Sequence, residues 1–521
     1  MSNETAQPGA DTEFIYDEVP YPALTFSQTH PDTLATMACF HGIDAADPAN
    51  CRVLEVGCGS GANLLAMAYT LPNSSFEGVD LSAVHIAEAQ ASAKELGLSN
   101  AAFRQLDITD LDINELGKFD FIIAHGVYSW VPGFVRTAIL KLYSTCLAEN
   151  GVGFISYNTY PGCHIRELVW NPMRFHTEGI ASWKEKVESG KMFIGAMANS
   201  TDPNSIFSAL IKQELQRLAD KPAAIVFHDD LEDTNTPFYF HQFTDDVRKS
   251  GLKYFAEADA KWLNLGGLSK DAQIFLKSME FDPERREQYL DFIRCNRFRN
   301  TLVCRTDVPV TRGPNVERMK NFFVTAHTEP VKRVEDINTP DVMKFRVPQG
   351  PTLGVDHPLT KAAFIVLGNT WPDRLRFDEL VKAALKIIDP LAAEALPDDI
   401  ETVAGYLAEA FRSGIVKLHR YHPSFFNGIS ERPHINAFAA WQLRSGSNSL
   451  AILTDAVIQP KYDLISKLIP LLDGTHDRAS LEQELRASVP ELKENAEVND
   501  KLPEIIESNL KAIAEAGLFA A

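Results

Sequence analysis

The chain has 521 residues, of which 45% are hydrophobic and 23% are charged, and this composition is typical of a soluble globular protein with about two to four domains. The net charge of −20 argues against nucleic acid as a partner, because phosphate binding depends on Lys and Arg, and it is compatible with a basic substrate. The start of the sequence is polar and acidic, unlike a secretion signal. No apolar run approaches the roughly 18 residues that span a membrane. The seven cysteines do not have the spacing of a metal site or of a disulfide framework. We therefore expect a cytoplasmic protein with no metal site and no stable membrane association.

The N-terminal segment from Tyr16 to Pro31 is rich in aromatic residues and proline, and it precedes the first predicted strand. Disordered tails are poor in aromatic residues, so we expect an extended lid over a ligand site. Its predicted ligand contacts are Tyr16, Tyr21 and His30.

Residues 51–157 alternate between strand and helix patterns. Apolar strands that alternate with helices predict a parallel sheet covered on both faces, and therefore an α/β fold. Ser82 is a plausible N-cap of the second helix. The predicted strands are 52–56, 76–80, 102–106, 119–124 and 151–157, and the predicted helices are 62–70, 82–97 and 132–148.

A glycine turn, Glu55-x-Gly57-x-Gly59-x-Gly61, links the first strand to the helix that begins near Asn63. Glycine removes the Cβ atoms that would keep a ligand from the backbone, and a helix start presents free N–H groups. Asp80 ends the second strand 23 residues after Gly57, where a carboxylate binds the two hydroxyls of a ribose. This pattern predicts a nucleoside-cofactor site.

Two cofactors fit the short motif. Gly57-x-Gly59-x-x-Ala62 matches the dinucleotide fingerprint in its alanine-ended form. The longer motif that starts at Glu55 resembles motif I of class I S-adenosylmethionine (SAM) methyltransferases, in which this acid helps to hold the methionine end. Asp107 ends the third strand, where that family contacts adenine. Acids at three successive strand ends suit a sulfonium and an α-amino group, and they suit a pyrophosphate badly. A strand-turn-helix without ligand is the third interpretation. The expected cofactor contacts, besides those of the lid, are Glu55, Gly57, Gly59, Gly61, Asn63, Asp80, Leu81, Asp107 and His125.

The residues after strands four and five should face the acceptor of the reaction. Tyr128 and Trp130 are the expected walls of an acceptor channel, and Tyr157 and Asn158 could orient an amine. His125 could contact adenine or accept a proton. The alternative for each is ordinary packing of a loop against the sheet.

After the fifth strand the sheet is interrupted. Residues 165–236 have a helical pattern, with breaks expected at Pro172, Gly179 and Pro203, and the acidic run 229–233 could receive a basic peptide or be a solvated loop. This insertion could gate the substrate, form a dimer contact or elaborate the fold. Residues 237–308 should then complete the sheet, with a helix closed by Gly251, a strand at 252–257, a helix at 282–296 and an antiparallel strand at 301–305.

The C-terminal part repeats one order of elements. Helices at 357–368, 376–388 and 400–413 precede a strand at 414–420, and a similar order recurs at 464–472, 480–487 and 502–516. This order is typical of a winged helix, in two copies at 309–430 and 431–521. Residues 309–521 carry 24 Lys and Arg against 29 Asp and Glu, so protein contact or substrate positioning is a better prediction than DNA binding.

Three phrases together resemble one family. They are Tyr16 to Pro31, Ser156 to Gly162 and His228 to Phe240. They are similar to bacterial class I methyltransferases with a methyltransferase regulatory domain, whose best-known relatives methylate lysines of a rickettsial outer-membrane protein. The resemblance implies a Rossmann-like seven-stranded sheet, SAM as cofactor, a lysine-bearing protein substrate, a homodimer and a peptide-sized cleft. The alternatives are a methyltransferase of a small molecule or lipid and a non-catalytic SAM-sensing regulator. The predicted boundaries are 1–164, 165–236, 237–308, 309–430 and 431–521.

Overall fold

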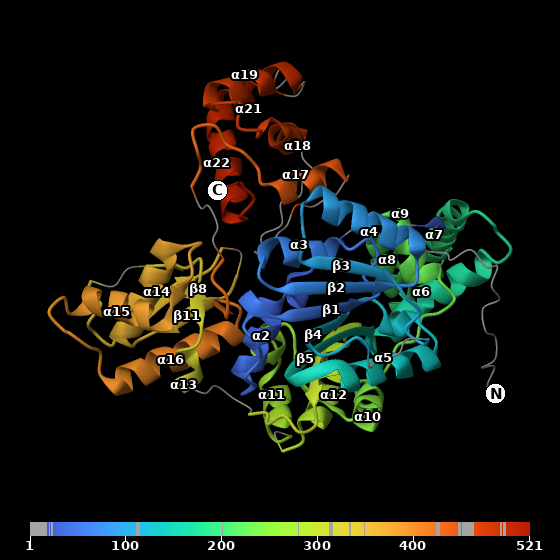
Figure 1. Ribbon diagram of the computed structural model, residues 1–521, viewed down its shortest axis with the longest axis horizontal. Coiled ribbons are helices and arrows are strands. Elements are labelled where there is room, and N and C mark those ends of the chain that lie inside the picture. The colour runs from blue at the N-terminus through green and yellow to red at the C-terminus, as the bar shows by residue number, and fades with distance from the viewer. Residues whose placement is uncertain are drawn as a thin grey trace.

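A seven-stranded mixed sheet forms the centre of the molecule (Figure 1). The computed structural model describes residues 18–19, 21, 24–110, 115–200, 202–279, 281–311, 316–332, 335–348, 350–423, 428–445, 450, 463–489, 492 and 496–520. The strands are β1 (Arg52–Val56), β2 (Ser75–Asp80), β3 (Ala101–Gln105), β4 (Phe119–Ala124), β5 (Leu147–Asn158), β6 (Leu252–Glu257) and β7 (Phe298–Arg305). Their order is β3-β2-β1-β4-β5-β7-β6, and β7 is antiparallel to both neighbours. The predicted strands and the antiparallel seventh strand are confirmed.

Successive residues of the strands point into two different cores. Val53 and Phe121 pair across β1 and β4 and face one core, while Leu54 and Ile122 pair beside them and face the other. One face is covered by α2 (Pro31–Phe40), α3 (Ala62–Thr70) and α4 (Ala83–Glu95), and the opposite face by α5 (Gly133–Cys146) and α10 (Phe240–Lys249). Ser82 caps α4 as predicted, because its side chain accepts from the backbone N–H of His85.

The insertion is helical, as predicted, and has its own apolar core, which includes Val169, Ile194 and Ile211. Its elements are α6 (Gly162–His176), α7 (Trp183–Ser200), α8 (Ile206–Ala219), α9 (Ala223–Val226) and the π-helical turn η5 (Phe227–Leu231). Gly179 and Pro203 lie between helices, but the break expected at Pro172 is wrong, because α6 continues through it. Proline removes one helical hydrogen bond, and burial of the neighbouring Val169 and Met173 offsets that loss.

The C-terminal part of the chain is mainly helical and lies outside the sheet as two groups, drawn in orange and red in Figure 1. The first group contains α14 (Pro358–Thr370), α15 (Phe377–Ile388) and α16 (Pro397–Arg412), with a small sheet of β12 (Leu375–Arg376), β8 (Phe323–Thr325) and β13 (Lys417–His419). The second contains α17 (Ala437–Arg444), α18 (Asp463–Leu468), η7 (Ile469–Leu471), α19 (Arg478–Ser488), α21 (Ala496–Asp500) and α22 (Leu502–Glu515). The winged-helix assignment of these groups stays a prediction.

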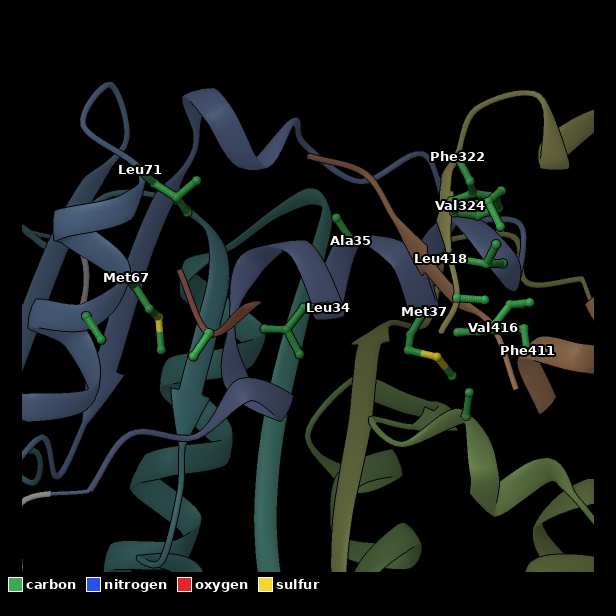
Figure 2. Close-up of a cluster of buried hydrophobic side chains, with 14 of the residues drawn as sticks. Leu34, Ala35, Met37, Met67, Leu71, Phe322, Val324, Phe411, Val416 and Leu418 are labelled. Atoms are coloured by element: carbon green, nitrogen blue, oxygen red, sulfur yellow. The ribbon is translucent and has the colours of Figure 1, made fainter. Parts of the chain in front are cut away.

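Helix α2 lies between the seven-stranded sheet and the first C-terminal group. Figure 2 shows Leu34, Ala35 and Met37 of this helix in one apolar layer that extends from Met67 of α3 to Leu418 of β13. The two parts of the chain therefore share a core through α2.

The remaining helices and strands complete the described structure. They are η1 (Ser27–Thr29), η2 (Pro48–Asn50), η4 (Tyr128–Trp130), η6 (Ala260–Leu263), α11 (Lys270–Lys277), α12 (Pro283–Arg294), α13 (Val316–Met319), β9 (Glu329–Pro330), β10 (Met343–Arg346) and β11 (Thr352–Val355). Within the described ranges, no helix has the length and apolar character needed to cross a membrane.

Candidate cofactor and acceptor site

The glycine turn lies at the carboxyl edge of the sheet, between β1 and α3, and backbone hydrogen bonds hold it against β2. The N–H groups of Gly57 and Cys58 donate to the carbonyl oxygen of Val79 at 2.8 and 3.2 Å. The N–H of Gly59 donates to Asp80 Oδ2 at 2.8 Å, and the N–H of Ser82 donates to Asp80 Oδ1 at 2.9 Å. These two donors orient the half-buried Asp80 carboxylate, whose oxygens keep further lone pairs for hydroxyl groups of a ligand.

The three glycines of the turn have different reasons to be glycine, although all have positive φ angles. A Cβ on Gly57 would lie 2.5 Å from Val127 Cγ2, and a Cβ on Gly61 would lie 2.7 Å from Phe103 Cε1. A Cβ on Gly59 would have no described atom within 4 Å. Neighbouring side chains therefore require glycine at positions 57 and 61, whereas the space beside Gly59 is open to a ligand.

Glu55 is buried beside this turn, with 4% of its surface exposed. Its Oε1 accepts from Asn63 Nδ2 at 2.7 Å, whereas Oε2 has no hydrogen-bond partner among the described residues. Burial raises the pKa of Glu55 to about 7, the nearby Asp80 carboxylate adds to this rise, and the Asn63 hydrogen bond opposes it. A buried carboxyl oxygen without a partner is rare because it loses hydration without compensation. The orphaned oxygen therefore fits a cationic ligand group.

Two further predicted cofactor residues lie at the same edge of the sheet. Leu81 directly follows β2 and is 48% exposed. Asp107 lies two residues beyond β3, is exposed, and accepts from the N–H and the hydroxyl of Thr109 at 2.8 and 2.7 Å. Both side chains are accessible to a ligand at this edge.

The N-terminal segment lies beside this site only in part. Tyr16 lies outside the described residues. Tyr21 is 40% exposed and lies against His228 of the insertion, with ring centroids 5.7 Å apart. His30 Nδ1 accepts from the N–H of Asp32 and caps α2, while its Nε2 has no hydrogen-bond partner within the described chain. Burial lowers the pKa of His30 to about 3, so the ring is neutral at neutral pH.

Phe26 reaches the site from this segment, although the sequence did not single it out. Its backbone N–H donates to Asn63 Oδ1 at 3.0 Å, and its ring lies 4.0 Å from the His125 ring, centroid to centroid. Asn63 is 6% exposed and bonds protein groups on three sides, so it positions Glu55 and the segment.

His125, directly after β4, lies among aromatic rings. Phe298 lies 6.2 Å from it at the start of β7, opposite Asn158 of β5, and is 40% exposed. The Nδ1 atom of His125 is buried and has no partner in the described structure. Burial lowers the pKa of His125 to about 4. Phe26, His125 and Phe298, here called the edge aromatic cluster, join three distant parts of the sequence. Phe298 was missed because the strand was predicted to begin three residues later.

The structure corrects two predicted acceptor contacts. Tyr128 and Tyr157 are each 1% exposed and pack with Phe238 and Phe243 in the core under the sheet, so neither side chain reaches the surface. The reason is that their positions face α10 rather than the carboxyl edge.

Asn158 and Trp130 differ in accessibility. Asn158 is 3% exposed, and its side-chain amide donates to Asn235 Oδ1 at 2.9 Å, so it binds the last loop of the insertion. Trp130, at the end of η4, is half-buried and is the accessible member of the predicted set.

Two of the four acids in the acidic run of the insertion pair with cations of the insertion itself. Arg166 binds Asp230 at 3.0 Å, and Lys221 binds Asp229 at 2.8 Å. These pairs disfavour the idea that this run receives a basic peptide.

The strand order, the antiparallel β7 and the glycine turn at the carboxyl edge define a class I methyltransferase fold. Residues 47–221 match a methyltransferase domain model, and residues 222–305 match a predicted methyltransferase regulatory domain.

Individual proteins are similar to large parts of the chain. The chain is 34% identical over 375 residues to Rickettsia prowazekii protein RP789, covering 71% of this chain and 68% of that one. It is 37% identical over 242 residues to protein RP028 of the same organism, and the match covers 46% of this chain and 95% of that one. The solved structure of PKMT2 from Rickettsia typhi in complex with AdoHcy is 27% identical, covers 96% of this chain and 100% of that one, and has a TM-score of 0.81. The chain belongs to the SAM-dependent methyltransferases that carry a methyltransferase regulatory domain. It is a methyltransferase whose cofactor is SAM.

Proposed function

We propose that this enzyme methylates lysine side chains of a protein substrate. The observation that carries the proposal is the edge aromatic cluster, in which an exposed Phe298 lies beside His125 at the carboxyl edge of the sheet. The resemblance of the sequence to protein-lysine methyltransferases supports the same acceptor. A sheet edge with aromatic side chains suits a long cationic side chain, because ring faces attract ammonium groups.

On the cofactor side, we assign roles to five residues. Glu55 Oε2 receives the cationic methionine end, the backbone at Gly59 passes close to the ligand, and Asp80 accepts from the ribose hydroxyls. Asp107 and Leu81 lie toward the adenine. Bound SAM supplies an electrophilic methyl group on a cationic sulfur. The protein residues hold the ligand in a fixed direction, and orientation accounts for much of the acceleration of such a displacement.

On the acceptor side, the amine of lysine must lose its proton before it can attack. Desolvation between Phe26 and Phe298 lowers the pKa of an ammonium group, because burial disfavours the charged form. His125 is a weak base, since burial lowers its pKa to about 4, so it is suited to accept a hydrogen bond from the amine. Water then takes up the proton. Trp130 is a further candidate wall, and a homodimer remains part of the proposal.

Transfer of labelled methyl groups tests the acceptor. The purified full-length enzyme is incubated with methyl-labelled SAM and a lysate from cells that lack it, and the proteins are hydrolysed and analysed for methyl-lysines. We expect label in methyl-lysine, and about tenfold less with Phe298→Ala. If label appears only in lipids or small molecules, the acceptor is a lipid or a small molecule and not lysine. If the protein binds SAM but transfers no methyl group, it is instead a non-catalytic SAM-sensing regulator.

A further inference from the structure

Hydrogen bonds connect Glu55 to residues 24–30, here called the N-terminal strap. Asn63 Nδ2 donates to Glu55 Oε1 at 2.7 Å and to Thr29 Oγ1 at 3.0 Å. Asn63 Oδ1 accepts from the backbone N–H of Phe26 at 3.0 Å. The direction of the Asn63 amide, and with it the position of Glu55, therefore depends on where the strap lies.

Asp32 connects the same stretch of chain to the first C-terminal group. It lies in the first turn of α2, two residues beyond the strap, and its side chain is 8% exposed. Its Oδ2 accepts from Arg374 Nη1 at 2.9 Å and from His419 Nδ1 at 2.8 Å. Its Oδ1 accepts from the backbone N–H groups of Arg420 and Tyr421 at 2.6 and 3.0 Å. All four donors belong to residues 374–421.

The charge of Asp32 is stabilised by these donors. Burial alone would favour the protonated form, but Arg374 and His419 outweigh it and hold the pKa of this carboxyl below its usual range. Hydrogen bonds to an ionised group are short and directional, whereas apolar packing such as that of Leu34 and Met37 in Figure 2 has no preferred direction. The Asp32 bonds therefore add a directional contact between α2, which follows the strap, and the first C-terminal group.

A second contact between the methyltransferase domain and the C-terminal part has the opposite character. Arg444 of α17 pairs with Glu95 of α4 at 2.6 Å, but the two side chains are 60% and 50% exposed. Exposed ion pairs contribute little because water screens them. This contact leads to α4 and not to the strap, so it serves as a matched control.

We propose that the first C-terminal group sets the affinity of the SAM site through Asp32. Arg374 and residues 419–421 donate hydrogen bonds to Asp32. Asp32 thereby positions α2 and the strap that precedes it. The strap in turn binds Asn63, which binds Glu55. Asp32 is a positioning residue that does not touch the ligand. The proposal depends on the cofactor site alone, so it stands or falls separately from lysine methylation.

Calorimetric titration with S-adenosylhomocysteine tests this coupling in the full chain. Asp32→Asn keeps the size of the side chain and removes its charge, and we expect about tenfold weaker binding, within the usual range of coupling between sites. Glu95→Gln should bind as the unaltered protein does. Circular dichroism and thermal unfolding check that both variants are folded. If Asp32→Asn does not fold, His419→Ala removes one of the four donors and should weaken binding by a smaller factor.

Hydrogen exchange supplies a readout that a merely structural role would not change. Because coupling between two sites is reciprocal, S-adenosylhomocysteine should slow exchange in residues 417–421 of the unaltered protein. In Asp32→Asn that distant protection should disappear, and the strap should exchange faster. Unchanged affinity in folded Asp32→Asn, or no protection of residues 417–421 by the ligand, would overturn the proposal.

Discussion

The proposed cofactor half and the proposed acceptor half of the site are built in different ways. The cofactor half takes Glu55, Gly59 and Asp80 from one strand-turn-helix-strand unit and uses backbone N–H groups and carboxylates. The acceptor half takes Phe26, His125 and Phe298 from three distant segments and uses aromatic side chains.

The difference shows which kind of site can be recognised before the fold is known. A turn with positive φ angles restricts the residue type at each position, so it leaves a pattern in the sequence. An aromatic surface places no such demand on the local backbone, and many buried aromatic residues have the same local pattern. The following predictions separate the two halves.

Asp80→Ala should give the largest loss of ligand affinity, because it removes the carboxylate that is proposed to bind the ribose hydroxyls. Hydrogen bonds to a charged group contribute ~1.5–3 kcal/mol each, so two lost ribose contacts predict at least roughly 100-fold weaker binding of S-adenosylhomocysteine. The side chain is only half-buried, so the fold should survive. Calorimetry measures the affinity, and unchanged binding would mean that the ribose lies elsewhere.

Gly59→Ala and Gly61→Ala should separate binding from stability within the turn. Both positions have positive φ, so both substitutions strain the backbone. Only the Gly61 Cβ would meet Phe103 and Ala89, so Gly61→Ala should lose ~1–3 kcal/mol more stability in denaturant unfolding. Gly59→Ala should lose more ligand affinity. The reverse order would place the ligand away from Gly59.

Phe298→Ala should affect the acceptor half alone. Loss of one ring face that contacts an ammonium group predicts about tenfold lower kcat/KM for the acceptor, with unchanged affinity for S-adenosylhomocysteine. Phe281→Ala is the control, because Phe281 is 82% exposed and lies outside the cluster. Equal losses for acceptor and cofactor would assign Phe298 to the cofactor half.

The pH dependence of binding should give the smallest effect. With a pKa of about 7, Glu55 is partly protonated at neutral pH, and a cationic ligand group favours its charged form. Affinity for S-adenosylhomocysteine should therefore rise with pH, by about threefold between pH 6.5 and 7.5, and level off above. In Glu55→Gln this rise should be absent. A persistent rise in that variant would identify another titrating group.

The same carboxyl has a defined effect on folding. Because its pKa is raised in the folded protein, Glu55 stabilises the fold fully below its ordinary pKa, and this contribution is lost as the pH rises through about 7. Glu55→Gln should thus unfold at a higher temperature than the unaltered protein at pH 8 in the absence of ligand. Bound S-adenosylhomocysteine should reduce this difference in unfolding temperature, because the ligand stabilises the charged form of Glu55 in the unaltered protein.

Much of the sheet could be predicted from the sequence, because buried parallel strands are short apolar runs between helical patterns. Even the return of the sheet after the insertion was predicted, from Gly251 and the strand at 252–257. Pro172 was not predicted correctly, since its effect depends on what the helix buries. Tyr128 and Tyr157 were placed at the surface, although α10 covers them.

The sequence by itself determined the glycine turn, the acids at the strand ends and the class of cofactor, because backbone conformation and charge at these positions follow from residue type. Only the tertiary structure decided which aromatic rings reach the carboxyl edge, and that Asp32 binds groups 342 to 389 residues away. The physical reason is that burial and ion pairing are properties of the assembled chain. Whether a side chain lines the site, lies in the core or pairs with a distant charge depends on which distant segments pack against it.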